Sequence, residues 1–325
     1  MDTPSLLDTI EPELAERLVA RNEDIRNGSP ARPGIVAALG LASVPIALAA
    51  LSTDLYGQSG LPSKIKDVLD FALALEIFEN EFYKAVLGTS AVAAQNAAFA
   101  PVRALAATVP GAVATLQQIQ KHETQHVATL LATGATNVFN LDGTTFDFTG
   151  NRSASGGGPF AKATTDLPFL LEVAQGAEDT GVRAYKGQAA NLMSSSAILE
   201  AALRIHSVEA RHASRVRRMR RAAAGAPSSV RYSGTVRGGG AAAAGATDAG
   251  PNPTAVTAAF NLIYGAGANS ATAPSESNTT QAGVDIMSLA GAQFGIDAAQ
   301  EAFDEPLDRA DVVAIVQPFF IPTIS

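Results

Sequence analysis

The stretch FALALEIFENEFY at residues 71–83 places Glu76 inside a run of apolar side chains and Tyr83 seven residues after it. Residues seven apart lie on one face of a helix, two turns apart. The stretch GAEDTGVRAY repeats this spacing with Glu178 and Tyr185. A buried carboxylate is costly unless something pairs with it, so both stretches predict helices that point a glutamate towards a shared partner.

Two further stretches carry a glutamate followed three residues later by a histidine. KHETQH contains Glu123 and His126, and VEARH contains Glu209 and His212. Residues three apart share a helix face, so each pair can hold a metal ion from one side. One such pair is most often a solvated surface feature. Two pairs together with two Glu–Tyr repeats favour a metal site over a bundle that keeps the pattern without metal.

Pointed inward, these helices supply four carboxylates and two imidazoles, the ligand count of a dinuclear carboxylate site in a helical bundle. The predicted metal ligands are Glu76, Glu123, His126, Glu178, Glu209 and His212. The two Glu–Tyr motifs are 102 residues apart and the two Glu–His motifs 86 residues apart. Each half is therefore expected to form a helical hairpin, and two hairpins related by a pseudo-twofold axis would close on a shared pair of metals.

The helical patterns predict an all-α fold. Four long helices are expected at about 63–87, 112–132, 167–193 and 196–221, with a further Ala-rich helical stretch at 91–107. The connection at 133–166 is long for a loop inside a compact domain. A four-helix bundle with one long crossover is the ferritin-like arrangement.

On these residues the chain resembles the ferritin-like superfamily, and more narrowly the bacterial ferritin-like or desiccation-related group. The resemblance rests on FALALEIFENEFY, on the two Glu-x-x-His motifs, on AEDTGVRAY and on VEARHA, and it extends to AFDEPLDRADVVAIVQPFF near the C-terminus. It covers about residues 61–325. It implies that the six predicted ligands bind metal, and its desiccation-related branch suggests stress protection.

Five further residues are predicted to lie around the ligands: Glu79, Tyr83, His122, Tyr185 and His206. Glu79 lies one turn past Glu76 and is read as a neighbour of the ligands or a surface residue, with a further ligand as the alternative. The two histidines are read as orienting or core residues. The two tyrosines either bond ligand carboxylates or carry a transient radical, and packing with a satisfied hydroxyl is the simpler role.

The composition excludes several function classes. The chain has 325 residues and no Cys, which rules out disulfides, a thiol nucleophile and an iron–sulfur cluster. The net charge of −8 and the 6% of aromatic residues argue against nucleic-acid binding. Six arginines between positions 211 and 221 suit the negative end of a helix dipole and a solvated face.

Extensions flank the predicted bundle, which spans residues 61–221. Residues 1–60 contain an amphipathic helical stretch and an apolar run at 35–51, which is marginal for a membrane span and is read either as a buried helix or as an export or anchoring segment. The Gly/Ala-rich residues 222–325 begin with a linker and contain a short helix or strand at 254–264 and a helix at 298–317. This tail is expected to pack on the bundle or on a neighbouring subunit.

The donor set favours two Fe or two Mn ions over zinc or copper. The first hypothesis is an enzyme that uses O₂ or peroxide, either to oxidise Fe(II) or to remove peroxide. The alternative is a structural or protective self-assembling protein without turnover. A homo-oligomer is expected, and the cell envelope is favoured slightly over the cytoplasm. Membrane association is left open.

Overall fold

The computed structural model describes residues 60–153, 155–223, 253–265, 275–290, 299–300 and 302–324. The predicted amphipathic and apolar segments before residue 60 lie outside these ranges, as does most of the predicted linker at 222–253. None of the helices among the described residues combines the length and the apolar character that crossing a membrane requires.

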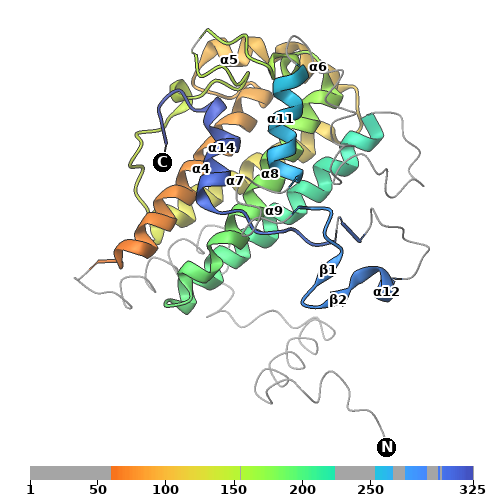
Figure 1. Ribbon diagram of the computed structural model, residues 1–325. Coiled ribbons are helices and arrows are strands. Elements are labelled where there is room, and N and C mark those ends of the chain that lie inside the picture. Colours follow the sequence, from red (N-terminus) through yellow and green to blue (C-terminus); the bar gives the residue numbers. More distant parts are fainter. Residues whose placement is uncertain are drawn as a thin grey trace, which may run out of the picture. The chain divides into compact units, whose positions relative to one another are not determined.

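Four long helices form the bundle, as predicted (Figure 1). They are α4 (Ser63–Leu87), α7 (Ala112–Ala132), α8 (Leu167–Gln188) and α9 (Ser196–Ala223). α4 packs along α7, and α8 packs along α9, so each half of the bundle is a helical hairpin. The described residues are mostly helical, and the all-α prediction is confirmed.

The ends of these helices follow from local chemistry. Gly88 takes a left-handed conformation after α4 (φ 79°), which favours glycine, and its N–H donates to the Ala85 carbonyl. At the start of α8, the Asp166 carboxylate accepts a hydrogen bond from the Phe169 N–H at 2.8 Å. α8 ends five residues before the predicted Met193, because the chain tightens into a 3₁₀ turn, η5 (Ala189–Leu192).

The Ala-rich stretch between α4 and α7 forms two short helices where the sequence predicts one. These are α5 (Ala93–Ala98) and α6 (Ala100–Ala107). The chain bends at Phe99, whose ring is buried against Phe82 and Phe148. Pro101 at the start of α6 has no N–H to donate to the preceding turn, which explains why the helix is interrupted there.

The long crossover between α7 and α8 carries aromatic side chains into the core. It contains two 3₁₀ turns, η3 (Gly143–Thr145) and η4 (Ala161–Thr164). Between these turns, Phe146 and Phe148 pack against Phe78 of α4. The backbone of Phe146 also bridges that of Phe320. Each buried aromatic ring is worth about 2 kcal/mol of transfer free energy, so the crossover is part of the core.

The C-terminal segment adds α11 (Pro253–Tyr264), the strands β1 (Thr280–Gln281) and β2 (Val284–Asp285), α12 (Ile286–Ala290), α14 (Arg309–Val316) and the turn η7 (Gln317–Phe319). The helix predicted at 298–317 is therefore wrong between residues 302 and 308, which are not helical, whereas residues 299–300 are helical. Pro306 disfavours the helical conformation of the residue before it. The helix starts only after Asp308, which caps it by accepting from the Asp311 N–H.

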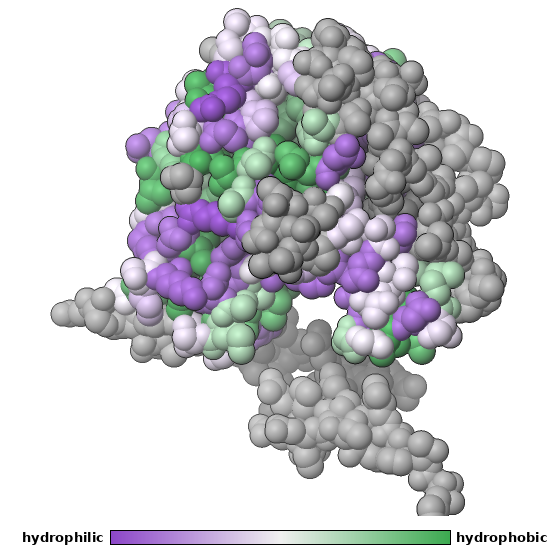
Figure 2. Space-filling model, viewed as in Figure 1, coloured by the Kyte–Doolittle hydropathy of each residue, from purple (hydrophilic) through white to green (hydrophobic). Residues whose placement is uncertain are grey.

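Within the C-terminal segment, α11 and α14 pack against α8 (Figure 1). Gly187 makes this possible, because a Cβ there would lie 1.8 Å from the Leu307 carbonyl oxygen. The fully buried Arg183 donates to the carbonyls of Glu305 and Ile263. Figure 2 shows that the apolar side chains exposed on this side of the molecule lie among polar ones.

Candidate metal centre

The structure brings all six predicted ligands together between the four long helices. Glu76 comes from α4, Glu123 and His126 from α7, Glu178 from α8, and Glu209 and His212 from α9. All six are at most 6% exposed. We call this set the carboxylate–histidine cluster.

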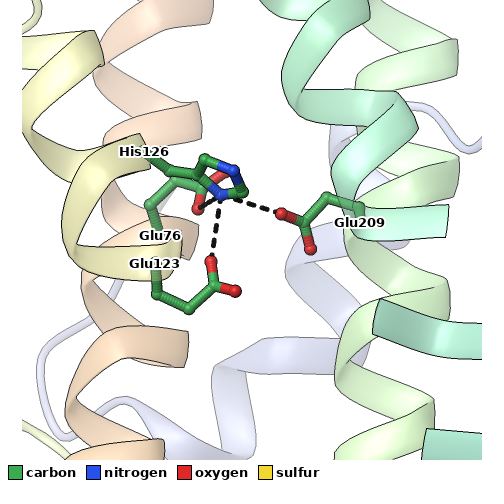
Figure 3. Close-up of side chains that lie close together, drawn as sticks. All are labelled: Glu76, Glu123, His126 and Glu209. Atoms are coloured by element: carbon green, nitrogen blue, oxygen red, sulfur yellow. Dashed lines mark hydrogen bonds and ion pairs between the residues drawn. The ribbon is translucent and has the colours of Figure 1, made fainter. Parts of the chain in front are cut away.

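In the first half of the cluster, one histidine nitrogen faces three carboxylates (Figure 3). His126 Nδ1 lies 3.0 Å from Glu76 Oε2, 3.1 Å from Glu123 Oε2 and 2.9 Å from Glu209 Oε1. Glu209 reaches His126 from the opposite hairpin.

The second half repeats this arrangement around His212. Its Nδ1 lies 2.9 Å from Glu123 Oε1, 3.2 Å from Glu178 Oε2 and 3.9 Å from Glu209 Oε2. Two groups of four residues result, in which one potential ligand atom per residue lies within 4.8 Å of the others. Glu123 and Glu209 belong to both groups, and each histidine belongs to one.

Two tyrosines extend the pseudo-twofold relation beyond the cluster. The Tyr185 hydroxyl, on α8, donates to Glu76 Oε1 of α4 at 2.6 Å. The Tyr83 hydroxyl, on α4, donates to Glu178 Oε1 of α8. Each tyrosine thus binds one oxygen of a glutamate on the other hairpin. The second oxygen of that glutamate faces a histidine.

Three buried oxygens in the cluster lack a well-aligned hydrogen bond. Glu123 Oε1 and both carboxylate oxygens of Glu209 are buried without a hydrogen-bond partner of good geometry. These are the two glutamates that both groups share. A carboxylate buried in this way needs a cation close by, so the donor set fits the binding of metal.

The pKa shifts in the metal-free cluster also indicate a place for cations. Burial, followed by the neighbouring Glu123 and Glu76 charges, raises the pKa of Glu209 well above its usual value. Burial alone would lower the pKa of His212, but Glu178 and Glu123 raise it to about 11. The folded protein without metal therefore retains protons, and cations would displace them.

Glu79 is fully inside the protein, so its reading as a surface residue is wrong. It is 4% exposed, and burial together with the charge of Glu209 raises its pKa well above the usual value. Gly181 makes room for it. A Cβ at Gly181 would lie 3.4 Å from Glu79 Oε1 and 3.3 Å from Glu209 Oε2. The sequence analysis missed this role, although a glycine inside a helix costs about 1 kcal/mol and therefore signals a close approach.

The two remaining histidines differ in their contacts. His122 stacks on His212 with the ring centres 5.1 Å apart, and its Nδ1 lies 2.8 Å from His212 Nε2. Its own Nε2 lies 2.6 Å from Gln118 Nε2, a contact that the sequence did not indicate. Partial burial and the neighbouring His212 lower the pKa of His122 to about 4. His206 instead lies 3.0 Å from the Val182 carbonyl and has no contact with a ligand histidine among the described residues.

Comparison with known families agrees with this geometry. Residues 65–222 match the family model described as a ferritin-like domain. These residues form a ferritin-like domain. The match runs from the start of α4 to the end of α9, so it contains the whole cluster. Comparisons with curated proteins and with solved structures found no match.

Proposed function

We propose that this protein binds two iron or two manganese ions in the carboxylate–histidine cluster and uses them for redox chemistry on Fe(II) or peroxide. The observation that carries the proposal is the sharing of Glu123 and Glu209 by two histidine-containing groups. A cluster that shares two carboxylates between two nitrogen donors has places for two cations. The ferritin-like domain supports the same interpretation.

The residues of the cluster have distinct tasks in this proposal. His126 with Glu76 holds one metal position, and His212 with Glu178 holds the other. Glu123 and Glu209 belong to both. Tyr83 and Tyr185 orient Glu178 and Glu76 through their hydroxyl groups.

A bound pair of iron or manganese ions supplies two-electron redox chemistry. Removal of peroxide balances without another reactant. One H₂O₂ gives up two electrons and two protons to become O₂, and a second H₂O₂ takes them up to become two waters. Oxidation of Fe(II) needs O₂ or peroxide as the oxidant. The burial of the cluster excludes bulk water from these exchanges.

Elemental mass spectrometry of the purified protein tests the proposal. We expect about two Fe or Mn per chain, and their loss in a Glu123→Ala/Glu209→Ala variant. A Glu81→Ala/Glu200→Ala variant is the matched control, since these carboxylates pair with Lys84 and Arg204 outside the cluster. Wild-type protein without metal would contradict the proposal. Bound metal without Fe(II) or peroxide turnover would favour the structural, protective role.

A further inference from the structure

Within the part of the chain that the structure describes, one side of the bundle is less covered than the others. α4 and α7 pack closely, as do α8 and α9. Across α4 and α8, the C-terminal α11 and α14 cover the bundle, with the Arg309 guanidinium 4.5 Å from the Phe71 ring centre. α7 and α9 make few contacts with each other. The boundary between these two helices is therefore the candidate route to the cluster.

Polar side chains connect this boundary to the cluster. We define the α7–α9 seam by Thr115, Gln118 and His122 of α7 and by Arg211, His212 and Arg215 of α9. Arg215 Nη2 donates across the seam to Thr115 Oγ1 at 3.1 Å. The contacts from Gln118 to His122 (2.6 Å) and from His122 to His212 (2.8 Å) then form a line from the exposed surface to the cluster.

The seam contrasts with the inner face of α9, where arginines are neutralised. Arg217 pairs with Asp179 at 3.0 Å, and Arg220 pairs with Glu172 at 2.9 Å. Arg211 and Arg215 are exposed and form no ion pair with a carboxylate among the described residues. The only acidic residue of α7 is Glu123, which is buried in the cluster.

Besides Glu209 of the cluster, the acidic residue of α9 is Glu200, which lies away from the seam. Glu200 is near the start of the helix and pairs with Arg204. The described part of the seam therefore presents positive charge and hydrogen-bonding groups. Such a surface attracts anions, leaves small neutral molecules unhindered and repels divalent cations.

We infer that the α7–α9 seam admits a small anionic or neutral molecule to the His212 side of the cluster, and that Fe²⁺ is not the substrate that enters there. This inference rests on the proposed function and narrows it. The two metal ions are resident, and the molecule that arrives is a peroxide or a ligand of similar size. The two halves of the cluster are then unequal, because His212 belongs to the seam and contacts His122, whereas His126 does not belong to it.

Azide, a small anion, is the probe for the test. Its affinity for the iron-loaded protein is measured by absorbance titration in the wild type and in an Arg211→Glu/Arg215→Glu variant. The rate of Fe²⁺ uptake by the metal-free protein is measured in parallel. A Lys64→Glu/Arg204→Glu variant is the control, because it changes the net charge equally at exposed positions outside the seam.

We expect the seam variant to bind azide about tenfold more weakly and to take up Fe²⁺ faster, with the control close to wild type. Azide affinity within twofold of wild type in the seam variant would overturn the inference while leaving the metal centre intact. Wild-type protein that takes up no iron would overturn the proposed function, and the inference with it. Metal content after full loading separates the two failures.

Discussion

Because Glu209 belongs to both halves of the cluster, we expect its charge to lower the stability of the metal-free protein and to strengthen metal binding. Two ionised carboxylates whose oxygens lie within 4.8 Å repel each other by at least about 3 kcal/mol at an effective dielectric constant of 20. Glu209 also loses its contact with solvent, and neither of its oxygens accepts a well-aligned hydrogen bond. A Glu209→Gln substitution keeps the shape of the side chain and removes the charge.

We expect Glu209→Gln to stabilise the metal-free protein. The gain is smaller than the repulsion, because the substitution also weakens the contact with His126 at 2.9 Å and because Glu209 is partly relieved by protonation. We expect the free energy of unfolding to rise by about 2 kcal/mol, which corresponds to a rise in Tm of about 4–8 °C for a domain of this size. With metal present the order should reverse, since only the wild type gains the full free energy of metal binding.

Thermal unfolding followed by circular dichroism, with chelator and with added Mn²⁺, measures both effects. Glu172→Gln is the matched control. Glu172 is also buried on a bundle helix, but it pairs with Arg220 at 2.9 Å. Because Glu172 lies outside the cluster, its neutralisation should change Tm by the same amount with and without metal. A metal-free Glu209→Gln protein that is less stable than wild type would refute the reasoning.

Three further predictions follow from the same contacts. In chelator, the stability of the wild type should fall from pH 5 to pH 8. The raised pKa values of Glu79, Glu209 and His212 let the folded state hold protons that the unfolded state releases. A Tm that rises over this range would contradict the raised pKa values. Tyr83→Phe and Tyr185→Phe should each cost about 1.5–3 kcal/mol in denaturant unfolding, and equally so, since their bonds to Glu178 and Glu76 are equivalent; a large difference between them would argue against the pseudo-twofold relation. Gly187→Ala should lower the free energy of unfolding by about 1–3 kcal/mol and speed proteolysis of residues 253–324. Although Ala favours a helix, its Cβ would collide with the Leu307 carbonyl. Unchanged proteolysis would mean that the C-terminal segment does not depend on this contact.

The bundle was predictable because its signals are local. Helical periodicity and the Glu–Tyr and Glu–His spacings are set within one helix, and the spacings show which faces point inward. The predicted bounds of α4 and α7 agree with the structure. The six candidate ligands come together as the repeat of the two halves implies. The tyrosine hydroxyls bond carboxylates of this set, which is one of the alternatives that the sequence left open.

Features that depend on docking between distant segments could not be predicted in this way. The burial of Glu79 depends on which side chains the tertiary fold brings near. The break at Phe99 and the late start of α14 instead follow from Pro101 and Pro306, which are local signals. Arg183 looks like an ordinary surface arginine in the sequence, yet the C-terminal segment buries it completely. The contact between His122 and His212 depends on the spacing of α7 and α9, which no motif encodes.

Several expectations from the sequence stay predictions. They include the boundaries at residues 60 and 221, the desiccation-related grouping, the link to stress protection, the homo-oligomer and the location at the cell envelope. The apolar run at 35–51 lies outside the described residues, so its alternatives stay open.

Anomalous X-ray diffraction from crystals of the metal-loaded protein tests the central claim most directly. We expect two anomalous peaks per chain, one near His126 Nδ1 and Glu76 and the other near His212 Nδ1 and Glu178, with Glu123 and Glu209 close to both. A single peak, or peaks that avoid Glu123 and Glu209, would contradict it.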